Sequence, residues 1–202
     1  MKDPARRLQT SLQHLLAEIR ACNHCAAHLP LGPRPVLQAG ASARLLIIGQ
    51  APGRKVHQTG IPWDDASGER LRDWIGLTPA QFHDPSKVAI LPIGFCYPGR
   101  AASGDLPPRP ECAPLWHHRL NAHLPQIRLT LLIGRHAQIH YLGRACRATL
   151  GETVRAWPEY LQKGLLPLPH PSPRNQPWLA KNLWFSAEVL PPLRQAVRAA
   201  MR

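Results

Sequence analysis

Four short apolar runs, separated by amphipathic segments, constrain the fold of this 202-residue chain more than any other feature. The runs are typical of buried strands, and they lie at residues 44–49, 88–95, 129–134 and 165–169. Pro92 would interrupt a hydrogen-bonded ladder, so we expect it at the end of the second strand or at a bulge. Strands that alternate with helices form a parallel sheet covered on both faces. The sequence therefore predicts an α/β fold, a three-layer α/β/α sandwich with a central four-stranded parallel sheet.

Apolar residues three or four positions apart predict the helices. The first covers residues 5–20 and ends in a CxxC turn, so that the N-terminal helix and this turn occupy residues 5–25. Thr78 followed by Pro79 is typical of a helix start. The other helices are predicted at residues 67–75, 111–124, 135–142 and 188–201, and a long loop at residues 96–110. The length suits one core, so we expect a single domain over residues 1–202.

The charge of the chain indicates what it binds. Lys and Arg number 25 against 12 Asp and Glu, which gives a formal net charge of +13. The basic residues are dispersed, and this favours a folded surface that faces a polyanion. No run of about 18 apolar residues is present, and the N-terminus lacks the apolar core of a secretory signal. We therefore expect a cytoplasmic protein with no membrane partner.

The loop after the first strand is a candidate binding floor. Gly49-Gln50-Ala51-Pro52-Gly53 follows the apolar run directly. Few bulky side chains lie in this loop, so its backbone N–H groups could approach a ligand closely. Ligands of open α/β sheets bind beyond the carboxyl ends of the strands. On spacing alone, a plain strand-to-helix connection explains the loop equally well.

Four of the five cysteines form a pattern, Cys22-x2-Cys25 and Cys96-x15-Cys112. In a cytoplasmic protein this spacing favours a metal site over disulfides. Four thiolates suit either zinc or a [4Fe–4S] cluster, and ordinary buried cysteines are the third interpretation. Cys146 has no partner in this pattern and is expected to be a small core residue.

Together these motifs resemble the iron–sulfur, or family 4, class of the uracil-DNA glycosylase superfamily, over residues 21–184. The loop at residues 49–53 is similar to the family's Gly-Glu-Ala-Pro-Gly motif. Gly60-Ile61-Pro62-Trp63 is similar to its Gly-Arg-Pro-Phe segment, and His170-Pro171-Ser172 matches its His-Pro-Ser motif. The resemblance implies that Cys22, Cys25, Cys96 and Cys112 hold a [4Fe–4S] cluster, with zinc as the alternative occupant.

The resemblance also implies a role for each motif in removing a base that has been flipped out of DNA. Trp63 would stack on the base, and His170 would donate a hydrogen bond to a base carbonyl as negative charge develops there. Gly49, Gln50 and Ala51 would form the floor. Asp64 or Asp65 could supply a carboxylate. The DNA contacts would come from Pro52, Gly53, Arg54, Ser172 and Arg174.

Two departures from the family pattern leave the target base open. Gln50 replaces the family's Glu, and Pro92 stands where the family has an Asn that reads uracil. We expect a monomeric DNA glycosylase for uracil or another deaminated or damaged base. The alternatives are a relative with a pocket for a different base, a non-catalytic nucleic-acid-binding protein that keeps the cluster and pocket, and a zinc-dependent structural domain.

Overall fold

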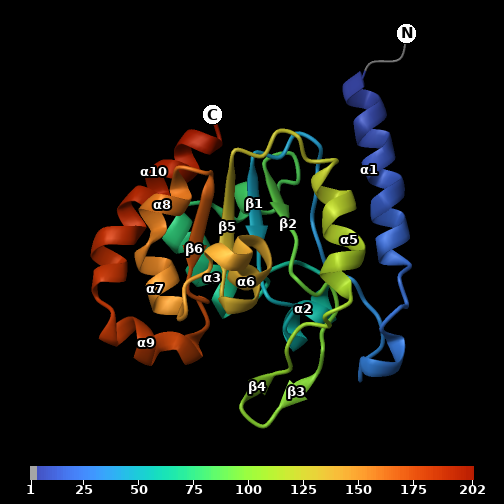
Figure 1. Cartoon of the computed structure of the whole chain (residues 1–202). Coiled ribbons are helices and arrows are strands. Elements are labelled where there is room, and N and C mark those ends of the chain that lie inside the picture. Colours follow the sequence, from blue (N-terminus) through green and yellow to red (C-terminus); the bar gives the residue numbers. More distant parts are fainter. Residues whose placement is uncertain (1–3) are drawn as a thin grey trace.

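A computed structural model describes residues 4–202, so the first three residues of the predicted domain lie outside it. The central parallel sheet has the strand order β2-β1-β5-β6. Its strands are β1 (Leu45–Ile48), β2 (Val88–Ile90), β5 (Leu129–Ile133) and β6 (Leu165–Leu168). Helices cover both faces of the sheet (Figure 1), so the predicted three-layer α/β/α sandwich is confirmed.

Alternating residues of the strands build two separate cores, because successive side chains point to opposite faces of a sheet. Leu46 and Ile48 pack with α1 (Pro4–Arg20), α5 (Cys112–Asn121) and α6 (Arg135–Leu142). Leu45 and Ile47 pack with α3 (Ala66–Ile75) and α10 (Leu190–Ala200). Every residue of β1 and β5 is buried, as expected for strands covered on both sides.

The second strand is shorter than predicted, because β2 ends at Ile90 and Pro92 follows it. The C-terminal helix is also shorter, since a π-helical segment, Phe185–Val189, precedes α10. Four short helices and a β-hairpin outside the sheet were not predicted, because each is too short to show a period. The helices are α2 (Arg54–Thr59), α7 (Leu150–Arg155), α8 (Trp157–Leu161) and α9 (Gln176–Lys181). The hairpin, β3 (Arg100–Ala101) with β4 (Gly104–Asp105), lies within the predicted loop.

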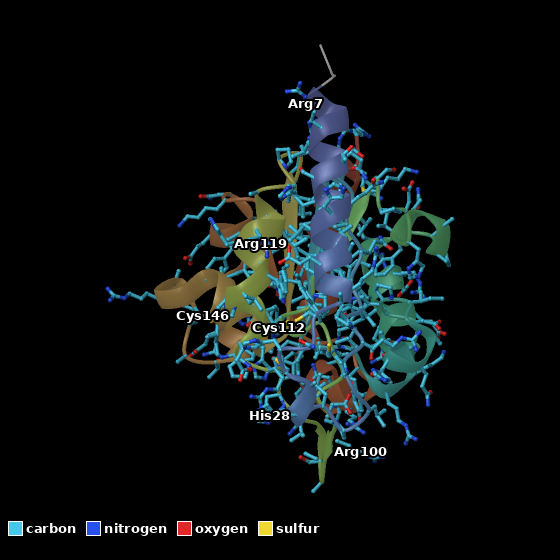
Figure 2. The ribbon with its side chains drawn as sticks, turned by 90° about the vertical axis from the view of Figure 1, so that its right-hand side faces the viewer. Arg7, His28, Arg100, Cys112, Arg119 and Cys146 are labelled. Carbon is cyan, nitrogen blue, oxygen red and sulfur yellow. The ribbon has the colours of Figure 1, made fainter. Side chains whose placement is uncertain are left out.

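Side-chain interactions stabilise several of the helices. α4 (Pro79–Phe82) begins with the expected Thr78 cap, which exchanges hydrogen bonds with Gln81 as a capping box. The Glu18 carboxylate of α1 pairs with the Arg119 guanidinium of α5, and Figure 2 looks onto these two helices. Within residues 4–202, no helix is both long and apolar enough to cross a membrane.

Candidate functional site

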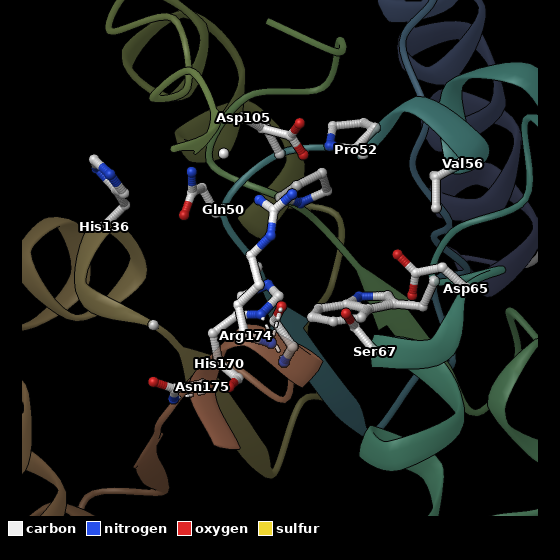
Figure 3. Close-up of a pocket in the computed structure, with 18 of the residues that line it drawn as sticks. Gln50, Pro52, Val56, Asp65, Ser67, Asp105, His136, His170, Arg174 and Asn175 are labelled. Atoms are coloured by element: carbon white, nitrogen blue, oxygen red, sulfur yellow. Dashed lines mark hydrogen bonds between the residues drawn. The ribbon is translucent and has the colours of Figure 1, made fainter. Parts of the chain in front are cut away.

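A cleft of about 500 Å³ opens at the carboxyl ends of the strands. It is the position at which open α/β sheets bind ligands. Gly49, Trp63 and His170 all line it, and they belong to three different segments of the chain. Figure 3 shows Gln50, Asp65 and His170 around this cleft. The segments that carry the three sequence motifs therefore meet in one place.

Backbone pairing fixes the floor of the cleft. Ile93 N–H donates to the Gly49 carbonyl (2.9 Å), and Gly94 N–H donates to the Gln50 carbonyl (3.0 Å). Pro92, directly before these two residues, lines the cleft, and its carbonyl accepts from His117 Nε2 at 3.0 Å. Pro92 thus presents an apolar ring to the cleft where an amide side chain could have bound a base.

Trp63 is held in an unusual conformation. Its φ of 57° is the only positive φ of a non-glycine residue within the described chain. Two glycines make room for it: a Cβ built on Gly68 would lie 1.8 Å from the Trp63 carbonyl oxygen, and one on Gly49 would lie 3.0 Å from the indole. Backbone held in the left-handed region at a cleft is typical of a functional position.

His170 packs against the Trp63 indole, with ring centroids 5.5 Å apart and planes 29° from parallel. The Ser172 backbone N–H donates to His170 Nδ1 at 3.1 Å, so in the neutral ring the proton is on Nε2. Burial lowers the pKa of His170, and the Asp65 carboxylate acts in the opposite direction. His170 is therefore a neutral hydrogen-bond donor near pH 7.

Of the two adjacent carboxylates, Asp65 lines the cleft, whereas Asp64 lies outside its lining and is 3.9 Å from the Lys55 ammonium. Asp65 Oδ1 accepts from the Gly68 N–H at 2.8 Å and so caps the start of α3. A Cβ built on Gly53 would lie 3.9 Å from Asp65 Oδ2 and 3.6 Å from Asp105 Oδ2. The two carboxylates thus approach the same part of the floor.

The loop after β6 forms one wall of the cleft. Arg70 Nη1 donates to the carbonyls of Pro171 and Ser172, each at 3.4 Å. Ser172 Oγ accepts from the Arg174 N–H, and Asn175 Nδ2 donates to the His170 carbonyl. These bonds give the loop a defined shape beside His170.

Most of the predicted site residues come together at this cleft. Its lining includes ten of them: Gly49, Gln50, Ala51, Pro52, Gly53, Trp63, Pro92, His170, Ser172 and Arg174. Arg54 is outside the lining, at the exposed first position of α2, directly after Gly53. The cleft is also lined by four residues that were not predicted from the sequence: Ser67, Asp105, His136 and Asn175. Only His136 had a usable signal, since it follows the third predicted strand by a few residues.

The four patterned cysteines, Cys22, Cys25, Cys96 and Cys112, line one second cavity, and all are free thiols. Cys112 Sγ accepts from the Phe95 N–H at 3.3 Å. The fifth cysteine, Cys146, is elsewhere, beside the Arg135 guanidinium at 3.2 Å. Across residues 4–202, no three His, Cys, Asp or Glu side chains are arranged to hold a single metal ion.

Burial makes these thiols poor acids in the metal-free chain. It raises the pKa of Cys96 to about 11 and that of Cys112 to about 12, and it also raises the pKa of Cys25. A thiolate in such surroundings needs a nearby cation. The chemistry of this donor set, four thiols around one cavity with an N–H bond to a sulfur, fits a thiolate-bound metal centre.

Comparison with known families agrees with the motifs in the cleft. The model of the "Uracil DNA glycosylase superfamily" matches residues 37–194 of the chain. The match covers well over half of the sequence. It includes both walls of the cleft and the third and fourth patterned cysteines, and it begins after the CxxC turn.

Proposed function

Because the chain belongs to the uracil DNA glycosylase superfamily, we propose that it hydrolyses the N-glycosidic bond of a base flipped out of DNA. The observation that supports this most directly is His170, whose Nδ1 is occupied by the Ser172 N–H and whose Nε2 carries the proton in the neutral ring. A neutral donor can bind a base carbonyl without repelling the positively charged sugar that forms during cleavage.

Hydrolysis breaks the bond between the base nitrogen and C1′ of the deoxyribose. The bonding electron pair leaves with the base, and a water oxygen becomes attached to C1′. The proton that this water loses ends on the departing base, which is released as a neutral molecule. Negative charge develops on the base carbonyl, so a bond from His170 Nε2–H strengthens in the transition state. Because the pKa of His170 is lowered, the ring stays neutral near pH 7 and the donor is present there.

Trp63 supplies the stacking surface beside this donor. Stacking on an aromatic ring contributes about 1–3 kcal/mol per base. The close approach of the indole to Gly49 and the tight contact of Gly68 with its carbonyl keep the ring in one position. Such a surface holds a base without identifying it.

Asp65 is the carboxylate best placed to stabilise positive charge on the sugar. Its Oδ1 is fixed by the Gly68 N–H, and it lines the cleft together with His170. A fixed negative charge near C1′ favours the transition state over the neutral substrate. Asp64, which lies outside the lining, has no such part in this proposal.

The target base is either uracil or another altered base. Pro92 contributes no amide, and its carbonyl is bound to His117. The Gln50 amide belongs to the floor of the cleft and can both donate and accept hydrogen bonds at a base edge. We therefore assign base reading to Gln50 in place of the family's Asn.

We further propose that Cys22, Cys25, Cys96 and Cys112 bind a [4Fe–4S] cluster. The cavity that all four line and the Phe95 N–H bond to Cys112 Sγ support this assignment. When bound, such a cluster supplies a covalent clamp between the end of α1 and the loop after β2. Zinc is the alternative occupant, and visible absorption with equal iron and sulfide contents distinguishes the cluster from it.

The test is single-turnover release of a base from a panel of oligonucleotides, each with one altered base. Protein purified without oxygen should form abasic sites on uracil or on another member of the panel. His170→Ala should slow this step about 100-fold and leave DNA affinity nearly unchanged, whereas His118→Ala, on the exposed surface, should keep full rate. Tight binding with release of no base would contradict the enzyme proposal and favour a binding protein.

A further inference from the structure

The β3–β4 hairpin, residues 100–106, stands opposite the loop of residues 171–175 across the cleft. Ser103, Gly104 and Asp105 line the same cleft as His170. A Cβ built on Gly104 would lie 2.9 Å from Arg174 Nη1, so the guanidinium packs directly on the hairpin backbone. In Figure 3 the Arg174 side chain extends over His170 towards Asp105. The Arg174 side chain therefore contacts the hairpin at one edge of the cleft.

The hairpin is anchored at its base and extends away from the sheet. The Leu106 N–H donates to the Gly99 carbonyl at 2.9 Å, which continues the pairing of Arg100 with Asp105. A Cβ on Gly99 would lie 2.9 Å from Pro30, so the hairpin base packs closely on the segment that follows the CxxC turn. Figure 1 shows the hairpin projecting beyond the carboxyl ends of the strands.

The residues at the tip of the hairpin are better suited to obstructing DNA than to recognising its base sequence. The tip consists of Ala101, Ala102, Ser103 and Gly104. None of these carries the amide or guanidinium group that usually reads base edges in the major groove. Arg100 is exposed at the root of the hairpin and offers a charge for a phosphate.

A duplex and a single strand meet this projection differently. Double-stranded DNA is stiff, with a persistence length of about 50 nm, so it cannot easily bend around an obstacle beside the cleft. A single strand is flexible and can bend past the hairpin to bring one nucleotide into the cleft. We propose that the hairpin is a second nucleic-acid contact that obstructs duplex DNA and selects an unpaired strand, with Arg100 bound to its backbone.

This inference rests on the proposed function, because DNA is taken as the ligand. Its test needs only DNA affinities and no measurement of base release. The probes are a fluorescent oligonucleotide without an altered base and the same oligonucleotide annealed to its complement, compared at low salt. We expect the native protein to bind the single strand at least tenfold more tightly. Equal affinities, or tighter binding of the duplex, would overturn the inference.

Two variants assign the preference to the hairpin. Because Arg100 and Asp105 are paired directly, Asn-Gly can replace residues 101–104 as a two-residue turn. This trimmed variant should bind the duplex more tightly and lose most of the preference. Arg100→Gln should weaken single-strand binding several-fold and reduce the salt slope by about 0.7. Arg198→Gln, exposed on α10 at the opposite end of the sheet, should change neither quantity.

A photo-reactive amino acid at position 102 keeps the inference testable if the trimmed variant does not fold. It should cross-link to the single strand, and absence of a cross-link would overturn the assignment. Base release is measured separately on the same preparations. If the single-strand preference depends on the hairpin but the protein releases no base, this inference is supported and the enzyme proposal is contradicted. If the protein releases a base but the hairpin has no effect on DNA affinity, the enzyme proposal is supported and this inference is contradicted.

Discussion

His117 lies behind the cleft floor and uses both nitrogens of its ring. Nε2 must carry the proton, because the Pro92 carbonyl at 3.0 Å can only accept. Nδ1 then accepts from the Tyr141 hydroxyl at 2.8 Å. Burial lowers the pKa of His117 to about 4, and it raises the pKa of Tyr141 to about 12. The floor at Pro92 is thus held by a histidine that must stay neutral.

This histidine should make the protein sensitive to mild acid. The unfolded chain binds a proton at His117 near pH 6.5, and the folded chain binds it only near pH 4. Stability from this group is present above pH 6.5 and is lost as the pH falls towards 4, by about 3 kcal/mol in total. Urea unfolding at several pH values should show a weaker pH dependence for His117→Gln. Identical slopes for the two proteins would contradict this assignment.

Gly68 and Gly151 form a matched pair of helical glycines. A Cβ on Gly68 would meet the Trp63 carbonyl at 1.8 Å, whereas one on Gly151 would meet only Trp178 at 3.9 Å. We expect Gly68→Ala to lower the free energy of unfolding by about 1–3 kcal/mol, because the strained Trp63 backbone cannot yield freely. Gly151→Ala should raise it by up to about 1 kcal/mol. Chemical denaturation measures both, and the opposite order would refute the packing argument.

At the scale of the element, the start of α3 contributes both to the stability of the protein and to the cleft. Asp65 caps this helix, and its carboxylate also lines the cleft. Removal of an N-cap side chain costs about 1 kcal/mol, but asparagine caps a helix as well as aspartate does. Asp65→Ala should therefore destabilise the protein, while Asp65→Asn should keep its stability.

The same two variants of Asp65 distinguish its role as a helix cap from the role of its negative charge in base release. Both should release bases at least tenfold more slowly, because each lacks the negative charge beside the sugar. Asp64→Asn is the control, since Asp64 lies outside the cleft lining. Base release by Asp65→Asn at the native rate would remove this carboxylate from the mechanism.

At the scale of the whole molecule, the cysteine cavity lies between the N-terminal helix and the segment that carries the hairpin. Cys22 and Cys25 follow α1, while Cys96 and Cys112 border the segment that contains the hairpin. A metal centre there would hold the N-terminal helix and the hairpin base to one another. Its loss should therefore affect the cleft wall as well as the N-terminus.

Cys112→Ala and Cys146→Ala test this linkage. Cys112→Ala should lose visible absorption and iron, and protease cleavage should increase between residues 96 and 112. Cys146→Ala should keep the absorption of the native protein, because its thiol contacts Arg135 away from the cavity. Full metal content in Cys112→Ala would contradict the ligand assignment.

The sequence by itself determined the sheet, the major helices and the position of the cleft. Runs such as Leu45–Ile48 and Leu129–Ile133 consist almost entirely of apolar residues, so their burial could be predicted from composition. The capping box at Thr78 is an interaction between residues close in the sequence and could be predicted in the same way. Parallel strands place their carboxyl ends at one edge of the sheet, so the motifs that follow β1 and β6 lie at the same edge.

Only the tertiary structure decided which groups share the cleft and how they are oriented. Asp105 reaches it on a hairpin too short for any periodic signal, and Asp65 is distinguished from Asp64 by the direction of a helix start. The proton on His170 Nε2 follows from a bond to the Ser172 backbone, and Pro92 turns its carbonyl towards His117, 25 residues along the chain. These properties depend on contacts between distant segments, and a local sequence pattern does not contain them.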